Sequence, residues 1–256
     1  MSPQIFDLQL TAGAWGITLA TMHQAAIAAQ FGVPRILLAN SVTADADISR
    51  LARLHPSTEI IVTSDSVGHA RRLATRLTAW GVQTPVPVLV EFGIPNQRSG
   101  CRTLDEVKAV LDEIGKHPQA LVPAGVLGYE GLLETGNRDE EAGSVQRWLG
   151  QFSQAAELVA GTPLYKNECI ISAGGSAFLD IVLDFMSAFR PAWHHRHVLR
   201  SGCAVVHDDG WYAGFAQALK ARGSHHIPLQ SALELWAVVQ GRPEPDLCIL
   251  SFGKRD

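Results

Sequence analysis

The chain has 256 residues, of which 46% are hydrophobic and 18% charged, and its formal net charge is −4. This composition suits a large apolar core and excludes a disordered chain, and the lack of a basic run argues against nucleic acid as a partner. No apolar run has the length of a membrane span, and the N-terminus lacks a basic-then-apolar signal. The four cysteines are far apart, which is typical of reduced thiols. We therefore expect a cytoplasmic protein that binds neither nucleic acid nor membrane.

Apolar runs that suit buried strands alternate with helical patterns along the first 200 residues. Such alternation predicts a parallel sheet covered by helices on both faces, and its period of roughly 30 residues favours a (β/α)8 barrel. Seven strands are expected, and the chain opens on a helix, so we expect a TIM-type barrel that lacks its first strand and occupies residues 1–202. The expected strands are 14–20, 35–40, 59–65, 86–93, 121–129, the apolar run that begins at 168, and 197–202; the expected helices are 3–10, 21–30, 46–54, 67–80, 104–115, 139–160 and one that begins at 177.

The pattern changes after residue 202. Short strand-like runs separated by Gly, Pro and Asp follow, and they indicate the incomplete beginning of a β-rich second domain, residues 203–256. These runs are 204–207, 211–212, 235–239 and 247–251. Asp208-Asp209-Gly210 is typical of a hairpin turn, and His225-His226 of an exposed turn.

The segment 168–176 has the pattern of a phosphate-binding turn. A short apolar strand ends in Gly174 and Gly175, followed by Ser176 and a helical pattern. Glycines let the backbone approach an anion, the N–H groups before a helix are unpaired, and Ser176 would cap the helix. The plainer alternative is a tight turn with a capped helix.

Polar side chains follow several expected strands, at the end where a barrel carries its chemistry. Arg98 and Arg200, a tyrosine and the glycine turn would together suit an anionic, planar ligand. An arginine beside a pyridine nitrogen would also keep that nitrogen unprotonated, because a second positive charge there is costly. The strand-end residues are Thr18, Thr21, Asn40, Asp65, Glu91, Tyr129, Ser172 to Ser176, and Arg200.

Six motifs in order carry a resemblance over nearly the whole chain. They lie at 12–21 (AGAWGITLAT), 35–40 (RILLAN), 90–100 (VEFG followed by RSG), 127–131 (LGYEG), 172–176 (SAGGS) and 199–203 (LRSGC). Together they resemble the fold-type III pyridoxal-phosphate enzymes of the D-threonine aldolase and D-serine dehydratase (amino acid deaminase) branch. The resemblance implies an alanine-racemase-like N-terminal barrel and a lyase acting on D-3-hydroxy amino acids, by deamination or aldol cleavage.

The resemblance also implies roles for individual residues. The cofactor phosphate would be bound by the segment 174–176 and by backbone N–H groups of 202 and 203. Arg200 would face the pyridine nitrogen, while Tyr129 and Arg98 would line the ring and the substrate carboxylate. The implied cofactor residues are Gly174, Gly175, Ser176, Arg200, Gly202, Cys203 and Tyr129, and the implied substrate-side residues are Arg98, Asn40 and Thr21.

The sequence departs from this family in two ways. The Schiff-base lysine of the family would precede Met1, and its zinc ligands, a His and a Cys, would follow Asp256. We therefore expect an incomplete form with no catalytic lysine and no metal ligand, possessing only Lys108, Lys116, Lys166, Lys220 and Lys254 at other places. The alternatives are a catalytically inactive barrel fragment that binds pyridoxal phosphate, and a (β/α)8 enzyme for another phosphorylated ligand. A homodimer and a small D-amino acid are the expected partners.

Two other clusters have plainer interpretations. His194, His195 and His197 lie after Pro191 and are expected in a loop rather than a metal site. An acidic run is expected to be solvated surface around a helix start. That run contains Glu130, Glu134, Asp139, Glu140 and Glu141.

Overall fold

Seven parallel strands follow one another across a single curled sheet in the computed structural model, which describes residues 2–207, 210–222 and 230–253. Each strand pairs with the next one in the chain, and β1 and β7 form the two edges of this sheet. The expected α/β fold of the TIM type with seven strands is confirmed. The strands are β1 (Ile17–Leu19), β2 (Arg35–Leu38), β3 (Glu59–Ser64), β4 (Val86–Phe92), β5 (Leu121–Gly128), β6 (Cys169–Ala173) and β7 (His195–Leu199).

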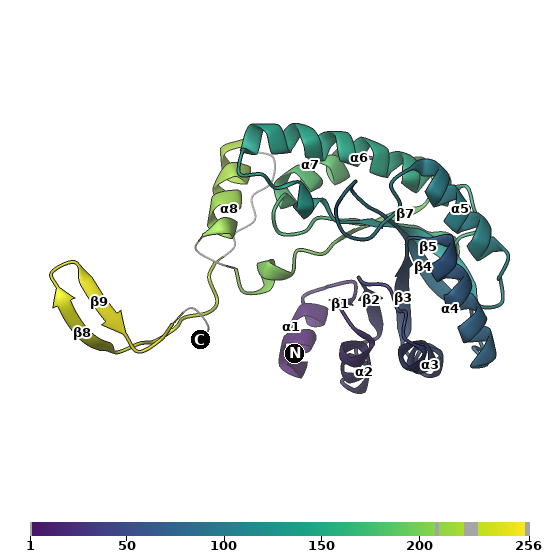
Figure 1. Cartoon of the computed structure of the whole chain (residues 1–256), viewed down its shortest axis with the longest axis horizontal. Coiled ribbons are helices and arrows are strands. Elements are labelled where there is room, and N and C mark those ends of the chain that lie inside the picture. Colours follow the sequence, from purple (N-terminus) through teal and green to yellow (C-terminus); the bar gives the residue numbers. More distant parts are fainter. Residues whose placement is uncertain (1, 208–209, 223–229, 254–256) are drawn as a thin grey trace. The chain divides into compact units, whose positions relative to one another are not determined.

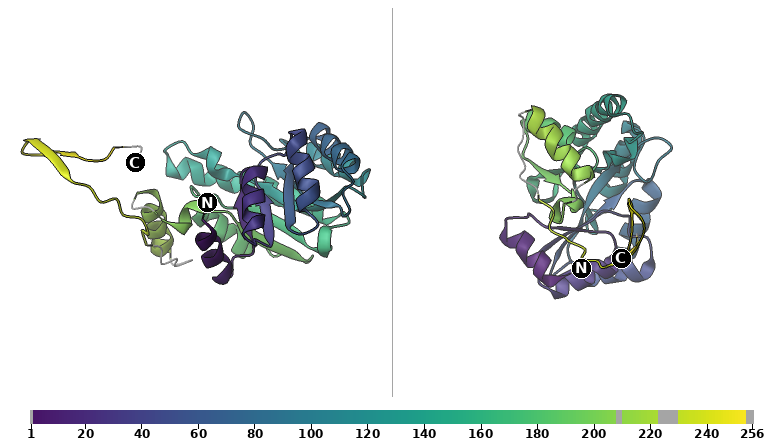
Figure 2. Two further views of the ribbon diagram at one scale, coloured as in Figure 1. Left: turned by 90° about the horizontal axis from the view of Figure 1, so that it is seen from below. Right: turned by 90° about the vertical axis from the view of Figure 1, so that its left-hand side faces the viewer.

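Helices cover the outer face of the curled sheet, as Figures 1 and 2 show. Several begin at a capping side chain: Thr21 and Thr103 each form a reciprocal capping box, and Ser66 accepts a hydrogen bond from His69 N. None of the described helices is long and apolar enough to cross a membrane. The helices are α1 (Pro3–Thr11), α2 (Met22–Gln30), α3 (Asp45–Leu54), α4 (Val67–Ala79), α5 (Leu104–Gly115), α6 (Arg138–Ala160) and α7 (Leu179–Ala188), with short 3-10 turns η1 (Glu130–Leu133) and η2 (Tyr165–Asn167).

The sheet separates two apolar layers. The larger layer lies between the strands and the helices, and every residue of β4 is buried. The smaller layer fills the concave side with residues from successive strands: Leu37, Ile61, Leu89, Ala124, Leu127 and Ile170. This inner packing is typical of TIM-type barrels, whose interior is a core rather than a pore, so chemistry is confined to the strand ends.

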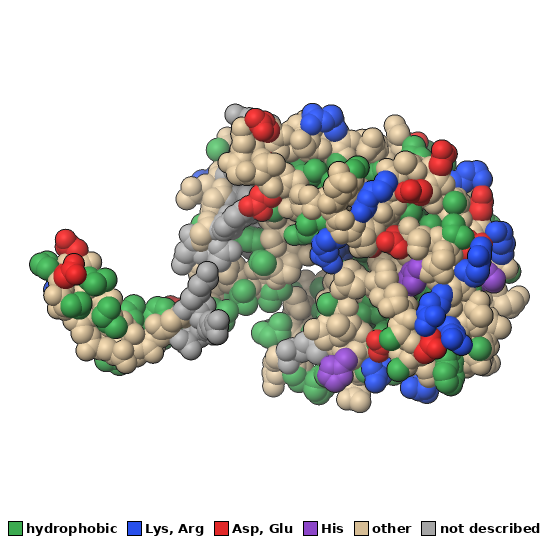
Figure 3. All heavy atoms as spheres, in the orientation of Figure 1, with side chains coloured by type: hydrophobic (Ala, Val, Ile, Leu, Met, Phe, Trp, Pro, Cys, Tyr) green, Lys and Arg blue, Asp and Glu red, His purple; other side chains and the backbone are tan. Residues whose placement is uncertain are grey.

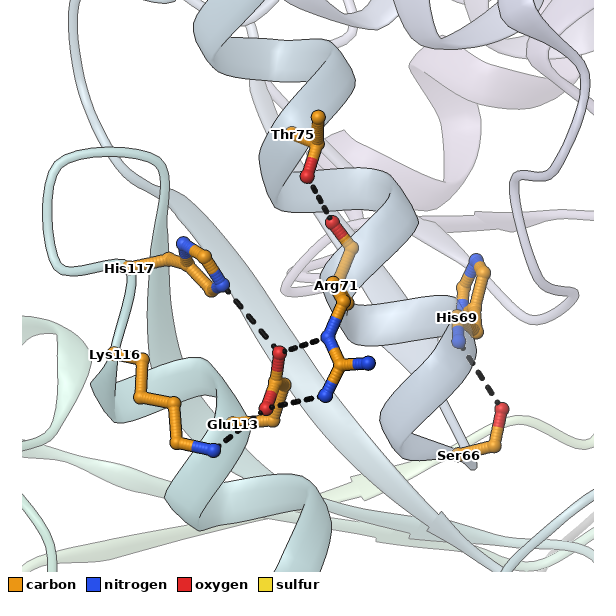
Figure 4. Close-up of polar contacts among 7 residues, drawn as sticks. All are labelled: Ser66, His69, Arg71, Thr75, Glu113, Lys116 and His117. Atoms are coloured by element: carbon orange, nitrogen blue, oxygen red, sulfur yellow. Dashed lines mark hydrogen bonds and ion pairs between the residues drawn. The ribbon is translucent and has the colours of Figure 1, made fainter.

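Charges of both signs are interspersed over the face of the first unit seen in Figure 3. One ion-pair cluster joins α4 to α5 around Glu113, whose side chain is only 3% exposed. Arg71 Nε lies 2.7 Å from Glu113 Oε1, Lys116 Nζ lies 2.9 Å from Oε2, and His117 also faces this carboxylate (Figure 4). Hydrogen bonds from Arg71 and Lys116 lower the pKa of the Glu113 carboxyl to about 2.

Replacing Glu113 with glutamine is expected to lower the melting temperature at pH 7 by several degrees, because Arg71 and Lys116 lose their anionic partner. A depressed carboxyl pKa stabilises the fold above the ordinary value of 4.5 and stops doing so as the pH falls towards 2. The difference between the two proteins should therefore shrink over that range in thermal melts. Asp112→Asn is the control, because within the described part of the chain Asp112 pairs only with the exposed Lys108. Equal melting temperatures of wild type and Glu113→Gln at pH 7 would contradict this expectation.

The chain divides into two compact units, Met1–Ser201 and Gly202–Asp256, which differ from the expected boundaries by one residue. The second unit contains η3 (Gly202–Val205), α8 (Trp211–Arg222) and an antiparallel hairpin of β8 (Val239–Glu244) and β9 (Leu247–Leu250). The strand-like interpretation of 204–207 and 211–212 is wrong. Residues 211–212 are instead the first two residues of α8. The rest of that helix is rich in Ala, Gln, Leu and Lys, and their helix propensity outweighs the strand propensity of the two aromatic residues. Asp208, Asp209, His225 and His226 lie outside the described residues.

The expected loop around the histidines is also wrong in part. The strand β7 begins at His195 rather than at His197, because Cys169 pairs with His195 and Ile171 with His197 along the whole length of β6. Pairing with a neighbouring strand thus overrides the local signal of Pro191. The imidazole rings of His195 and His197 lie 4.9 Å apart, beside Phe189 and Trp193.

Candidate functional site

A cavity of about 190 Å³ lies at the carboxyl ends of β2, β4, β5 and β7, and we call it the strand-end cavity. In a TIM-type fold this is the end where ligands bind. The structure brings together five of the residues selected from the sequence, which lie at or after the ends of four different strands. The polar residues that line the cavity are Asn40, Glu91, Arg98, Ser99, Tyr129 and Arg200.

Arg200 follows β7 and is held by two neighbouring strands. Its Nε donates a hydrogen bond of 2.9 Å to Ser172 Oγ on β6, and its guanidinium also donates to the carbonyl oxygen of Gly128 on β5. Burial lowers the pKa of Arg200, while the nearby Glu130, Glu91 and Tyr129 raise it. Since a guanidinium stays protonated in proteins, Arg200 places a fixed positive charge in the cavity.

Arg98 reaches the cavity from the loop after β4. Its guanidinium donates to Asn40 Oδ1 at 3.2 Å, and Asn40 in turn donates to the carbonyl of Ala20 at 3.1 Å. Arg102 fixes this loop, because it donates to the carbonyl oxygens of residues within 97–100. The loop therefore presents Arg98 as a second cation, exposed enough to meet a ligand.

Glu91 is a buried acid at the end of β4 that sequence reasoning placed near the site without giving it a role. Its Oε1 accepts a hydrogen bond of 2.9 Å from Ser99, and its buried Oε2 has no hydrogen-bond partner among the described residues. Burial raises the pKa of the Glu91 carboxyl, whereas Ser99 and the two cavity arginines act in the opposite direction. Glu91 is thus a group that can hold a proton beside Arg98 and Arg200.

The turn after β6 differs from its expected form. Its N–H groups do not point outward unpaired: Gly174 N donates to Glu130 Oε2 at 3.2 Å, and Gly175 N donates to Glu130 Oε1 at 2.7 Å. Glu130 itself was expected on the surface but is 0% exposed. Glu141, another member of the acidic run, is also buried and accepts hydrogen bonds from Thr135 N and Gly136 N. Both acids are buried because backbone N–H groups converge on their carboxylates.

Glycine is required at both positions of this turn for different reasons. Gly174 has a φ of +83°, in the left-handed region. A Cβ at Gly175 would lie 2.3 Å from Cε2 of the Tyr129 ring. The turn after β7 lies alongside, since Ser201 Oγ donates to the carbonyl oxygens of Gly174 and Gly175 at 2.7 and 3.1 Å.

Three other expected roles have different outcomes. Ser176 is not the helix N-cap: α7 begins three residues later, after the buried Phe178, because the turn first buries that ring. Thr21 does not line the strand-end cavity and instead caps α2 by accepting a hydrogen bond from Gln24 N at 3.2 Å. Gly202 and Cys203 belong to the second unit, and their part in phosphate binding stays a prediction.

The donor set of the first unit fits a phosphorylated, planar ligand. Two backbone N–H groups of the turn donate to the two carboxyl oxygens of Glu130, so they are placed to bind a pair of oxygens. Arg200 and Arg98 supply positive charge, and the Tyr129 ring lies between the turn and the cavity. Pyridoxal phosphate has this combination of phosphate and aromatic ring.

The described residues offer no comparable site for a metal ion. Within residues 2–207, 210–222 and 230–253, no group of three His, Cys, Asp or Glu residues could hold a metal ion. The residues that the structure describes therefore do not fit the zinc of the resembling family, and no step below depends on a metal.

Several proteins of known structure have a fold similar to that of this chain. No model of a known protein family matches the sequence, and neither does any curated protein. Among solved structures, D-threonine aldolase from Filomicrobium marinum is similar with a TM-score of 0.75 and 21% identity, covering 98% of this chain and 63% of its own. D-threo-3-hydroxyaspartate dehydratase from Delftia sp. HT23 is similar with a TM-score of 0.62 and 24% identity, covering 81% and 52% respectively.

Alanine racemase from Bacillus anthracis is also similar, with a TM-score of 0.56 and 17% identity, covering 88% of this chain and 51% of its own. The chain thus spans between about half and 63% of the length of these proteins. All three are fold-type III pyridoxal-phosphate enzymes, the group that the sequence resembles. The comparison shows that the chain shares their fold.

Proposed function

We propose that the chain is the pyridoxal-phosphate-binding barrel of a lyase that acts on D-3-hydroxy amino acids, like D-threonine aldolase or D-serine dehydratase. The observation that supports this most is the meeting of Arg98, Tyr129 and Arg200 in one cavity beside the Gly174–Gly175 turn. The shared fold with D-threonine aldolase and D-threo-3-hydroxyaspartate dehydratase supports the substrate class.

The cofactor residues would act by charge and by backbone hydrogen bonds. The N–H groups of Gly174 and Gly175, with the Ser176 hydroxyl and the N–H groups of Gly202 and Cys203, would hold the phosphate. Arg200 would face the ring nitrogen and keep it unprotonated, because a second positive charge beside a guanidinium is costly. When bound, the cofactor supplies an electron sink for cleavage of a bond in the amino acid.

The substrate residues would act on the opposite side of the cavity. Arg98 would bind the substrate carboxylate, and its hydrogen bond to Asn40 Oδ1 would hold the guanidinium towards the cavity. Glu91 would place a buried carboxyl group beside the substrate, one whose pKa is raised by burial. Glu91 lies at the end of β4 and Arg98 in the loop that follows it, which Arg102 holds by hydrogen bonds to backbone carbonyl oxygens.

A second candidate, a barrel that binds the cofactor without turnover, is supported by the positions of the lysines. Within the described part of the first unit, no lysine lines the strand-end cavity. Lys108 pairs with Asp112 and Lys116 with Glu113, both on α5, whereas Lys166 pairs with Glu59 at the start of β3. Without an amine in the cavity, this chain by itself would bind the cofactor only non-covalently.

Borohydride reduction tests whether this chain by itself attaches the cofactor covalently and turns over an amino acid. We expect that reducing a mixture of the purified chain and pyridoxal phosphate leaves no lysine stoichiometrically labelled, as measured by peptide mass spectrometry, and that D-serine and D-threonine are not turned over. Stoichiometric labelling of one lysine together with turnover would instead show that the chain alone is a complete enzyme.

A further inference from the structure

Glu130 is an acid buried where an anionic ligand is expected. It begins η1, directly after β5, and its side chain reaches a turn 44 and 45 residues further along the chain. Each carboxylate oxygen takes one N–H group of that turn, and neither oxygen is exposed to water, because the residue is 0% exposed. The two N–H groups of the glycine turn are therefore already taken by a carboxyl group of the protein.

The geometry of the turn ties it to this carboxylate. A Cβ at Gly175 would lie 3.4 Å from Glu130 Oε1 and 2.3 Å from the Tyr129 ring, so ring, carboxylate and backbone are in contact. One N–H group points at one acceptor, and hydrogen bonds weaken steeply when that direction is lost. A phosphate oxygen and the Glu130 carboxylate cannot both accept from these two N–H groups, and their negative charges would also repel each other.

The surroundings of the Glu130 carboxyl group affect its pKa in opposite directions. Burial raises the pKa of the Glu130 carboxyl, whereas the hydrogen bonds from Gly175 and Gly174 and the charge of Arg200 act in the opposite direction. Moving the carboxylate into water would remove the burial cost. The residues that follow Glu130 are less buried than it is: residues 131–133 are half-buried and residues 134–137 are exposed.

We propose that Glu130 is an internal occupant of the Gly174–Gly175 turn, and that a phosphate ester binds there by displacing its carboxylate. The contact is autoinhibitory: the turn stays ordered without ligand, and the ligand must compete for it. This inference rests on the proposed function only where it names pyridoxal phosphate as the phosphate ester. The displacement itself can be tested with inorganic phosphate, which has the same kind of oxygen acceptors.

The test compares Glu130→Gln with Glu134→Gln. Glutamine at 130 has no charge and turns an amide N–H₂ towards one of the two N–H groups, so it competes poorly. Glu134 is four residues away, exposed, and not an acceptor of the turn's two N–H groups, so its substitution is the matched control. Because the competing carboxyl group is removed, Glu130→Gln should bind inorganic phosphate and pyridoxal phosphate at least about tenfold more tightly than wild type.

Two readouts are measured on all three proteins. Calorimetric titration gives the affinities, and nitrogen-15 spectra of glycine-labelled protein report the amides of Gly174 and Gly175 directly. In wild type, phosphate should shift both amide resonances as the acceptor changes from carboxylate to phosphate. Circular dichroism establishes whether each variant is folded. If Glu130→Gln is unfolded, the phosphate-induced shifts of the Gly174 and Gly175 amide resonances in wild type decide whether the carboxylate is displaced.

The outcomes distinguish this inference from the proposed function. Tighter phosphate binding by Glu130→Gln with shifted glycine amides, but no binding of pyridoxal phosphate, would uphold the displacement and reject the cofactor. Equal pyridoxal phosphate affinity in folded wild type and Glu130→Gln, or ligand binding without any shift of the two amides, would overturn the displacement and leave the cofactor in place. Absence of phosphate binding to folded Glu130→Gln would also overturn it.

Discussion

Replacing Arg200 with glutamate is expected to weaken pyridoxal phosphate binding by at least about thirtyfold, because loss of a buried, hydrogen-bonded charge typically costs 2–5 kcal/mol. Arg200 donates to Ser172 Oγ and the Gly128 carbonyl, and it lies near both Glu91 and Glu130. The substitution would put a third carboxylate among two acids and invert the charge facing the ligand ring.

The measurement is an absorbance titration of pyridoxal phosphate with each protein. Arg147→Glu on α6 is the matched control, since Arg147 is exposed and, among the described residues, its guanidinium bonds only to Ser144 Oγ. If Arg200→Glu does not fold, Arg200→Gln is titrated in its place, because it removes the charge but keeps N–H donors. Unchanged titration curves for folded Arg200 variants would rule out a cofactor contact for this residue.

Alanine at Gly175 is expected to destabilise the protein and to abolish phosphate-ligand binding together. Its Cβ would lie 2.3 Å from Cε2 and 2.9 Å from Cδ2 of the Tyr129 ring, so ring or backbone must move. Overpacking of this kind typically costs 1–3 kcal/mol. The moved ring would also leave the strand-end cavity, which Tyr129 helps to line.

Gly150→Ala is the control for this substitution. Gly150 lies in α6, where an added Cβ meets nothing within 4 Å, so alanine there should be neutral or stabilise by about 0.4–1 kcal/mol. Urea denaturation gives the two free energies of unfolding, and ligand titration gives the affinities. A Gly175→Ala protein as stable as Gly150→Ala, with normal binding, would contradict the packing argument.

The sequence is informative about this fold wherever a local pattern decides the structure. The strand β4 follows from the apolar run that begins at Val86, and the helix α5 follows from the helical pattern over 104–115, both visible without a structure. The meeting of Arg98 and Arg200 follows from the rule that parallel strands end on the same side. These features need no knowledge of distant contacts.

Glu130 shows what local pattern cannot predict. An acid in an acidic run before a helix is most simply solvated, and its burial depends on two N–H groups more than 40 residues away. A signal was present in the motif 127–131, where this acid directly follows the cavity tyrosine. Similarly, β7 begins at His195 because its partner β6 is long enough to pair there, which is a property of the sheet rather than of the segment.

The most direct test of the central claim, that this barrel binds pyridoxal phosphate through its phosphate, is to compare the affinities of pyridoxal phosphate and pyridoxal by equilibrium dialysis. The two ligands share the ring and differ in the group that the glycine turn would hold. We predict saturable binding of one pyridoxal phosphate per chain, at least about tenfold tighter than pyridoxal, because charged hydrogen bonds contribute about 1.5–3 kcal/mol. Equal affinities for the two ligands, or no saturable binding of pyridoxal phosphate, would contradict the claim.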